Sequence, residues 1–184
     1  MKNLLHVTIP LFWKGDLHIK ITHAERRDEH HFGIGNRCAD GLYIVFLDYD
    51  KTPLEWVRAE ITYLQDTYGL GSAYLFETKN GFHVVFLDKL ELDELITIMG
   101  CTSIDKRYMS VPLKYARRCW VLRQTPKKGE EIHYSGVYHS GSARELSEAH
   151  AIYLVRYGGV PPTDLNKGSW DRNKDIVLAY YTAP

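Results

Sequence analysis

The sequence lacks the features of a membrane or secreted protein. It contains no run of about 18 apolar residues, so no membrane-spanning helix is predicted. The first ten residues do not resemble a signal peptide, because His6 and Pro10 interrupt a short apolar stretch. Lysine and arginine together number 23, as do aspartate and glutamate. Since the chain has no net charge to attract a nucleic acid or a membrane, any nucleic-acid affinity must come from a local patch.

Cysteine is scarce as well. The three cysteines, Cys38, Cys101 and Cys119, are odd in number, far apart and not in the spacing of zinc ligands. We therefore expect reduced thiols in a cytoplasmic protein, and no zinc site. Internal repeats and low-complexity tracts are also missing. The 184 residues, 45% of them hydrophobic, predict a single compact domain over 1–184.

The most informative stretch is Leu42–Asp50. Six apolar residues run without a break into Asp48 and Asp50, a pattern typical of a strand that is buried on both faces. Because side chains alternate along a strand, both aspartates are expected on one side. Two such carboxylates repel each other, and a hard divalent cation such as magnesium or manganese would relieve that repulsion. The alternative is that Asp48 caps the following loop and Asp50 is solvated.

A helix is predicted directly after this strand. Thr52 and Glu55 have the spacing of a capping box, and Pro53 suits a first helical turn. Apolar residues then recur every three or four positions up to Tyr68, before Gly69. The pattern is a strand, a short turn and a helix.

A β-hairpin is predicted next, with strands at 72–78 and 82–87 around the turn Lys79-Asn80-Gly81. His83 lies close to the turn. A basic residue, a glycine that lets backbone approach a ligand, and a histidine converge here, which predicts a phosphate-binding site. The alternative is a histidine with a structural role.

Further elements follow from similar patterns. A short helix is predicted over 92–99, and strands over 17–22, 119–122 and 131–139. Ser142 and Glu145 form a second potential capping box, which predicts a helix continuing to Val155.

Positive charge is concentrated in 114–128, where no acidic residue occurs. Tyr115 and Trp120 lie between the basic side chains. Such a segment favours contact with a phosphate backbone or a triphosphate, and the alternative is a solvated charged loop. Its basic residues are Lys114, Arg117, Arg118, Arg123, Lys127 and Lys128.

Together these features resemble the catalytic core of the archaeo-eukaryotic primases, the primase-polymerase superfamily. Three motifs carry the resemblance in the family's order: Phe46-Leu47-Asp48-Tyr49-Asp50, Asn80-Gly81-Phe82-His83 with the strand that follows, and Ile104-Asp105. The segment from Cys119 to Gly129 is similar to the family's Leu-Arg-x-Pro stretch before a basic turn. The resemblance covers roughly 41–129. In the second motif Asn80 stands where the family often has serine.

The resemblance implies an α+β fold in which a mixed or antiparallel sheet is flanked by helices, with an RRM-like catalytic unit and an N-terminal α/β unit. It also implies two-metal nucleotidyl transfer. Asp48, Asp50 and Asp105 would hold two magnesium or manganese ions, one activating the 3′-hydroxyl and the other binding the triphosphate.

The resemblance assigns the remaining polar residues to substrates. The nucleotide's phosphates would be contacted by Lys79, His83, Arg118 and Arg123. Lys127 and Lys128 would contact the phosphates of a single-stranded DNA template. The implied partners are this template, a ribo- or deoxynucleoside triphosphate, and a separate helicase or accessory primase subunit.

Two other functions fit parts of the same sequence. Glu77-Thr78-Lys79 downstream of Asp50 matches the skeleton of restriction-type nucleases, in which Asp50 and Glu77 hold the metal and Lys79 assists the attacking water. That hypothesis leaves Asp48, His83 and Asp105 without a role. The third hypothesis is a non-catalytic nucleic-acid-binding protein of replication that retains the fold.

Overall fold

The computed structural model describes residues 3–11, 15–22, 33–114, 119–123 and 131–165. The chain divides into two compact units, residues 1–30 and 31–184. The first unit contains strands β1 (Asn3–Leu11) and β2 (Gly15–Thr22), which pair antiparallel. The strand predicted over 17–22 is confirmed, whereas β1 was not predicted. The described residues of this unit form a hairpin without a helix, which differs from the α/β unit that the resemblance implies.

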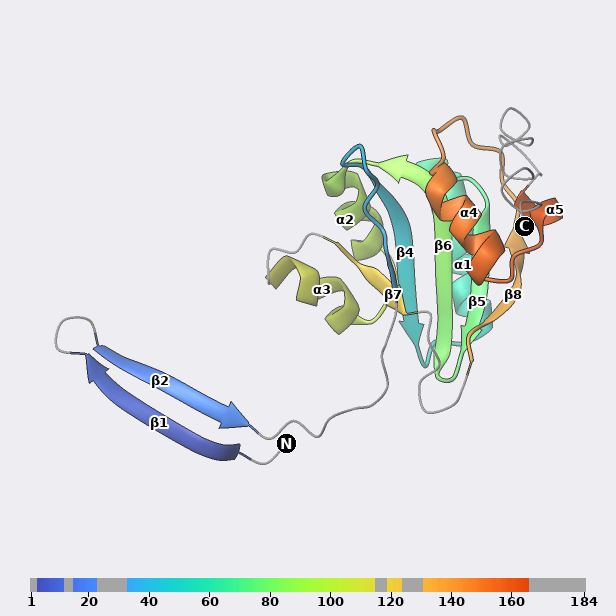
Figure 1. Cartoon of the computed structure of the whole chain (residues 1–184). Helices are drawn as coiled ribbons and strands as arrows, with labels where there is room; N and C mark the ends of the chain where they lie inside the picture. Colours follow the sequence, from blue (N-terminus) through green and yellow to red (C-terminus); the bar gives the residue numbers. More distant parts are fainter. Residues whose placement is uncertain (1–2, 12–14, 23–32, 115–118, 124–130, 166–184) are drawn as a thin grey trace. The chain divides into compact units, whose positions relative to one another are not determined.

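The second unit is built on a four-stranded antiparallel sheet (Figure 1). Its strand order is β4-β6-β5-β8, so β4 lies at one edge. The predicted class, an antiparallel sheet flanked by helices, is confirmed. The strands are β4 (Tyr43–Asp50), β5 (Ala73–Thr78), β6 (Gly81–Leu90) and β8 (His133–Tyr138).

Helices and one small additional sheet surround this sheet. Strands β3 (Gly33–Gly35) and β7 (Val121–Arg123) form the additional two-stranded sheet. In Figure 1, α4 crosses one face of the four-stranded sheet and α1 lies behind the other. The helices are α1 (Leu54–Tyr68), α2 (Leu92–Gly100), α3 (Lys106–Lys114), α4 (Glu148–Tyr157) and α5 (Pro162–Leu165).

Strand β4 is buried on both faces, as its apolar run predicts. Its odd-numbered residues, such as Val45 and Leu47, pack in the core formed with α1 and α2. Its even-numbered residues Ile44 and Phe46 pack in a second core with α4. The even-numbered Asp48 and Asp50 continue this second face, beyond its apolar part.

Neither predicted capping box forms. Helix α1 begins at Leu54 with Pro53 at the N-cap, and the Thr52 hydroxyl donates instead to the Asp50 carbonyl at 3.5 Å. The turn depends on Lys51, whose positive φ of 58° redirects the chain after β4. Residues 142–145 are not helical either. The chain continues beside β6, where the Ser147 N–H donates to the Leu87 carbonyl, and α4 begins only at Glu148.

Helix α3 was not predicted, because the sequence offered a basic run with Pro112 rather than a clear apolar period. The core strand predicted over 119–122 is found two residues later as β7. Trp120, just before it, is fully buried and its indole N–H donates to the Met109 carbonyl at 3.1 Å. This bond ties α3 to the chain entering β7.

Candidate functional site at the end of strand β4

The two aspartates of β4 lie on the same face of the sheet, as the strand period predicts. In the register of β4 with β6, Asp48 pairs with His83 and Asp50 pairs with Gly81. The Asp48 side chain is 27% exposed, and Asp50, at the last position of the strand, is exposed. Carboxylates at such an accessible strand end suit a hard cation that keeps some of its water ligands.

His83 contacts Asp48 across the two strands. Its Nε2 lies 3.4 Å from Asp48 Oδ1, and its side chain is only 9% exposed. On the other side of β6, Phe76 of β5 also pairs with His83. The imidazole is therefore held in place by its strand neighbours, with one nitrogen directed at the carboxylate.

Asp105 lies beside Asp48 along the free edge of β4. Its backbone N–H donates to the Asp48 carbonyl at 2.9 Å. Its carboxylate is engaged elsewhere, since Oδ1 accepts the N–H of Arg107 at 2.9 Å and so caps the first turn of α3. Within the described residues, no three side chains of histidine, cysteine, aspartate or glutamate are gathered as a metal site. Asp48 and Asp50 suit a divalent cation, whereas the Asp105 carboxylate is not gathered with them in this arrangement.

Tyr108 is a neighbour of this site that the sequence analysis missed. Its hydroxyl is buried and has no hydrogen-bond partner among the described residues. Burial raises the pKa of this phenol well above its usual value, and the negative charge of Asp48 raises it further. The signal in the sequence was its position, three residues after Asp105, which is one helical turn.

The turn between β5 and β6 forms as predicted, with Lys79 exposed in it. Gly81 is required where β4 and β6 approach closely. A Cβ at this position would lie 1.7 Å from the Tyr49 carbonyl oxygen. The predicted approach of a ligand to this glycine stays a prediction.

Arg123, at the end of β7, lines a small cavity together with His83. The structure thus brings this predicted phosphate-binding residue next to the histidine. Arg118, Lys127 and Lys128 lie outside the described residues, so their assignments stay predictions.

Glu77 lies on the opposite face of the sheet from Asp50. It pairs with Phe82, which pairs in turn with Tyr49. Residues that pair directly share a face, and Tyr49 belongs to the face covered by α1. Asp50 alternates with Tyr49 and faces the other way.

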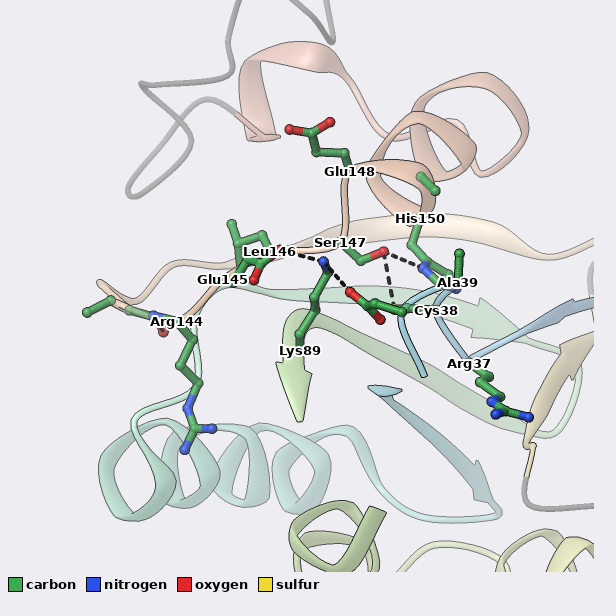
Figure 2. A pocket seen from close by; sticks show the side chains of 14 residues that line it. Arg37, Cys38, Ala39, Lys89, Arg144, Glu145, Leu146, Ser147, Glu148 and His150 are labelled. Atoms are coloured by element: carbon green, nitrogen blue, oxygen red, sulfur yellow. Dashed lines mark hydrogen bonds and ion pairs between the residues drawn. The ribbon is translucent and has the colours of Figure 1, made fainter. Parts of the chain in front are cut away.

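A larger cavity of about 850 Å³ lies at the opposite end of β6 (Figure 2). In it the Lys89 ammonium contacts Asp40 at 2.7 Å and Glu145 at 2.5 Å. These carboxylates raise the pKa of Lys89. Lys89 lies six positions after His83 along β6, which corresponds to roughly 20 Å at about 3.3 Å per residue. This cavity is therefore distinct from the end of β4.

A hydrogen-bonded chain forms one wall of the larger cavity. The Cys38 thiol lies 3.6 Å from the Ser147 hydroxyl, which lies 2.6 Å from His150 Nδ1. His150 Nε2 lies 2.9 Å from the Gly35 carbonyl, so Nε2 carries the proton and Nδ1 accepts from Ser147. Burial lowers the pKa of His150 and favours the neutral ring. These hydrogen bonds connect the start of α4 to β3.

Comparison of the chain with models of protein families, with curated proteins and with solved structures gives no match. Among the described helices, none has the length and apolar character needed to cross a lipid bilayer. The functional proposal below therefore rests on the residues themselves.

Proposed function

We propose that the protein is a template-dependent nucleotidyltransferase of the primase-polymerase kind, acting on single-stranded DNA. The observation that supports this most is the adjacency of the three motifs. Asp48 and Asp50 share a face at the end of β4, His83 pairs directly with Asp48, and Asp105 binds the Asp48 backbone. These segments lie up to 57 positions apart in the sequence, counted from Asp48 to Asp105.

The order of elements also favours an RRM-like catalytic unit. From β4 to α2 the chain runs strand, helix, strand, strand, helix, with β6 between β4 and β5. The acidic pair lies at the end of the terminal strand β4, where Asp50 is exposed.

In this proposal Asp48 and Asp50 would hold magnesium or manganese, with Asp105 as the third ligand after it leaves the α3 cap. The ions, two in the family, would supply positive charge for the phosphates and lower the pKa of the attacking hydroxyl. His83, whose Nε2 faces Asp48, is proposed to contact a phosphate oxygen. Arg123, which lines a cavity with His83, and Lys79 in the turn before β6 are proposed to add positive charge. Arg118, Lys127 and Lys128 are proposed to contact nucleotide and template phosphates.

The strand register disfavours the nuclease hypothesis. Its metal would need Asp50 and Glu77 together, and these side chains point to opposite faces of the sheet. The non-catalytic hypothesis makes a different prediction, template binding without any metal-dependent chemistry.

The proposal is tested by incubating the protein with manganese, a single-stranded template and labelled nucleotides. We expect wild type to extend a chain, and Asp48→Ala and His83→Ala to reduce extension by at least about 100-fold. Glu77→Ala, on the opposite face, should retain activity. Cleavage that survives His83→Ala and is lost in Glu77→Ala would overturn the proposal in favour of a nuclease. Template binding without extension would favour the non-catalytic protein.

A further inference from the structure

Helix α4 covers the face of the sheet to which the acidic pair belongs (Figure 1). Asp48 pairs with His83, and His83 pairs with Phe76, so these three residues form a row on that face. The end of α4 lies against this row, because a Cβ at Gly158 would lie 3.3 Å from Phe76 Cε1. The last residue of α4, Tyr157, is therefore placed beside the candidate site.

Tyr157 is an exposed aromatic residue at a largely apolar cavity. Its exposed fraction is 63%. It lines the small cavity, of about 60 Å³, together with His83 and Arg123. The other described residues of this lining are mainly apolar, and none of them carries a carboxylate. An apolar lining with an exposed ring at one side suits a flat ligand that has little charge of its own.

Tyr153, one helical turn before Tyr157, supports the exposed ring. The centroids of the two rings are 5.3 Å apart, and their planes are inclined by 44°. Because this neighbour restricts the movement of the Tyr157 ring, less conformational freedom is lost when a ligand stacks on it. Since most of Tyr157 nevertheless remains exposed, part of its surface is available to a ligand.

The surroundings of Tyr157 favour a nucleobase as this ligand. Every nucleobase has an aromatic face and can stack on a tyrosine ring whatever its sequence identity. His83 and Arg123, which line the same cavity, are the residues proposed above to contact phosphates. A ligand in which a flat ring is joined to a phosphate can therefore contact Tyr157 and these two side chains together.

The other strongly exposed aromatic residues in the described part of the chain lie elsewhere. Trp56 and Tyr63 are 62% and 44% exposed, and both belong to α1. Helix α1 packs on the face of β4 that contains Val45 and Leu47, which is opposite to the face of Asp48. A base stacked on either residue would be separated from the acidic pair by the sheet.

We propose that Tyr157 is a base-stacking residue that holds a nucleobase of the substrate at the rim of the small cavity. The base belongs to the nucleoside triphosphate or to a nucleotide of the single-stranded template. The identification of the ligand as a nucleobase rests on the function proposed above. None of the sequence motifs includes Tyr157, so this role adds a substrate-positioning residue to those that the resemblance assigns.

The test compares two ligands, each titrated into the whole protein in the presence of magnesium. Binding of fluorescein-labelled oligothymidylate is followed by fluorescence anisotropy, and binding of thymidine triphosphate by calorimetry. We expect Tyr157→Leu to weaken binding of one of these ligands at least about tenfold, because leucine is apolar but has no aromatic face. Tyr157→Phe, which keeps the ring, and Tyr63→Leu, a matched change on α1, should bind both ligands as wild type does.

Ligands without bases show whether stacking is the cause. An abasic oligonucleotide and inorganic triphosphate should each bind equally to wild type and to Tyr157→Leu. The ligand whose binding is weakened identifies the source of the base, the template for oligothymidylate and the nucleotide for thymidine triphosphate. Wild type that binds neither ligand, Tyr157→Leu that binds both unchanged, or an equal loss on the ligands without bases would overturn the proposal.

Chain extension, measured beside these titrations, separates this proposal from the proposed function. A protein that extends a chain while Tyr157→Leu binds both ligands unchanged would contradict the stacking role alone. A protein whose base binding depends on Tyr157 but that extends no chain would retain the stacking role and contradict the nucleotidyltransferase.

Discussion

Two carboxylates two residues apart lie on the same face when both belong to a regular strand. Asp48 and Asp50 have this arrangement because β4 remains regular to its last residue. The same regularity places His83 opposite Asp48. The first fact was predictable from the strand period, which is a local property. The second was not, because the pairing of β4 with β6 joins strands that are distant in the sequence.

Other residues of the site were not predictable. Tyr108 has a hydroxyl group that the fold buries without a described partner, and Tyr157 has an exposed ring at the end of α4. The sequence contains 13 tyrosines, and apart from the spacing of Tyr108 from Asp105 nothing local distinguishes these two from the rest. Their environment depends on how α3 and α4 pack, which is a tertiary property.

At the residue scale, His150 should make stability depend on pH. Burial lowers its pKa in the folded protein, so the neutral ring is favoured there. Its contribution is therefore present above the ordinary value of about 6.5 and is lost as pH falls from there towards the folded pKa. We expect wild type to lose more unfolding free energy than His150→Gln between pH 7.5 and pH 5, as measured by urea denaturation.

The comparison with His150→Gln isolates this histidine from the other titrating groups, which both proteins share. Two stability curves that run parallel across this pH range would show that His150 is not the group responsible.

At the scale of elements, α1, α2 and most strands of the four-stranded sheet were predictable, whereas β1, α3 and the start of α4 were not. The period of apolar residues defines a buried face whatever the surroundings are. A capping box competes with other hydrogen bonds, and here a left-handed Lys51 and the pairing of 146–147 with β6 prevail. In α3 the first turn is capped by Asp105, a residue that also fits a metal motif.

This double role of Asp105 leads to a prediction. Asn caps a helix about as well as Asp, whereas Ala does not. Asp105→Asn should therefore stay within about 0.5 kcal/mol of wild type in unfolding free energy, and Asp105→Ala should lose about 1 kcal/mol. Both variants should bind manganese more weakly in a titration followed by electron paramagnetic resonance.

Either measurement can contradict one of the two roles. Equal stability of the Asn and Ala variants would rule out the cap. Unchanged manganese affinity in Asp105→Asn would remove Asp105 from the proposed metal ligands and leave Asp48 and Asp50 alone.

At the scale of the whole second unit, the two ends of the sheet differ in how their charges are compensated. At the Lys89 end, ion pairs between protein side chains join the loops to β6. At the Asp48 end, His83 contacts Asp48, and Arg123 lines the same small cavity as His83 without a carboxylate in that lining. The first arrangement stabilises the fold, and the second is the one on which the functional proposal rests.

The central claim, a metal-dependent phosphoryl-transfer centre at the end of β4, is tested most directly by manganese binding. Free manganese can be followed by electron paramagnetic resonance in titrations of wild type, Asp48→Asn and Glu77→Gln. We predict that wild type and Glu77→Gln bind equally, while Asp48→Asn binds at least about tenfold more weakly, because one carboxylate ligand is lost. Binding that is lost in Glu77→Gln and retained in Asp48→Asn would contradict the account.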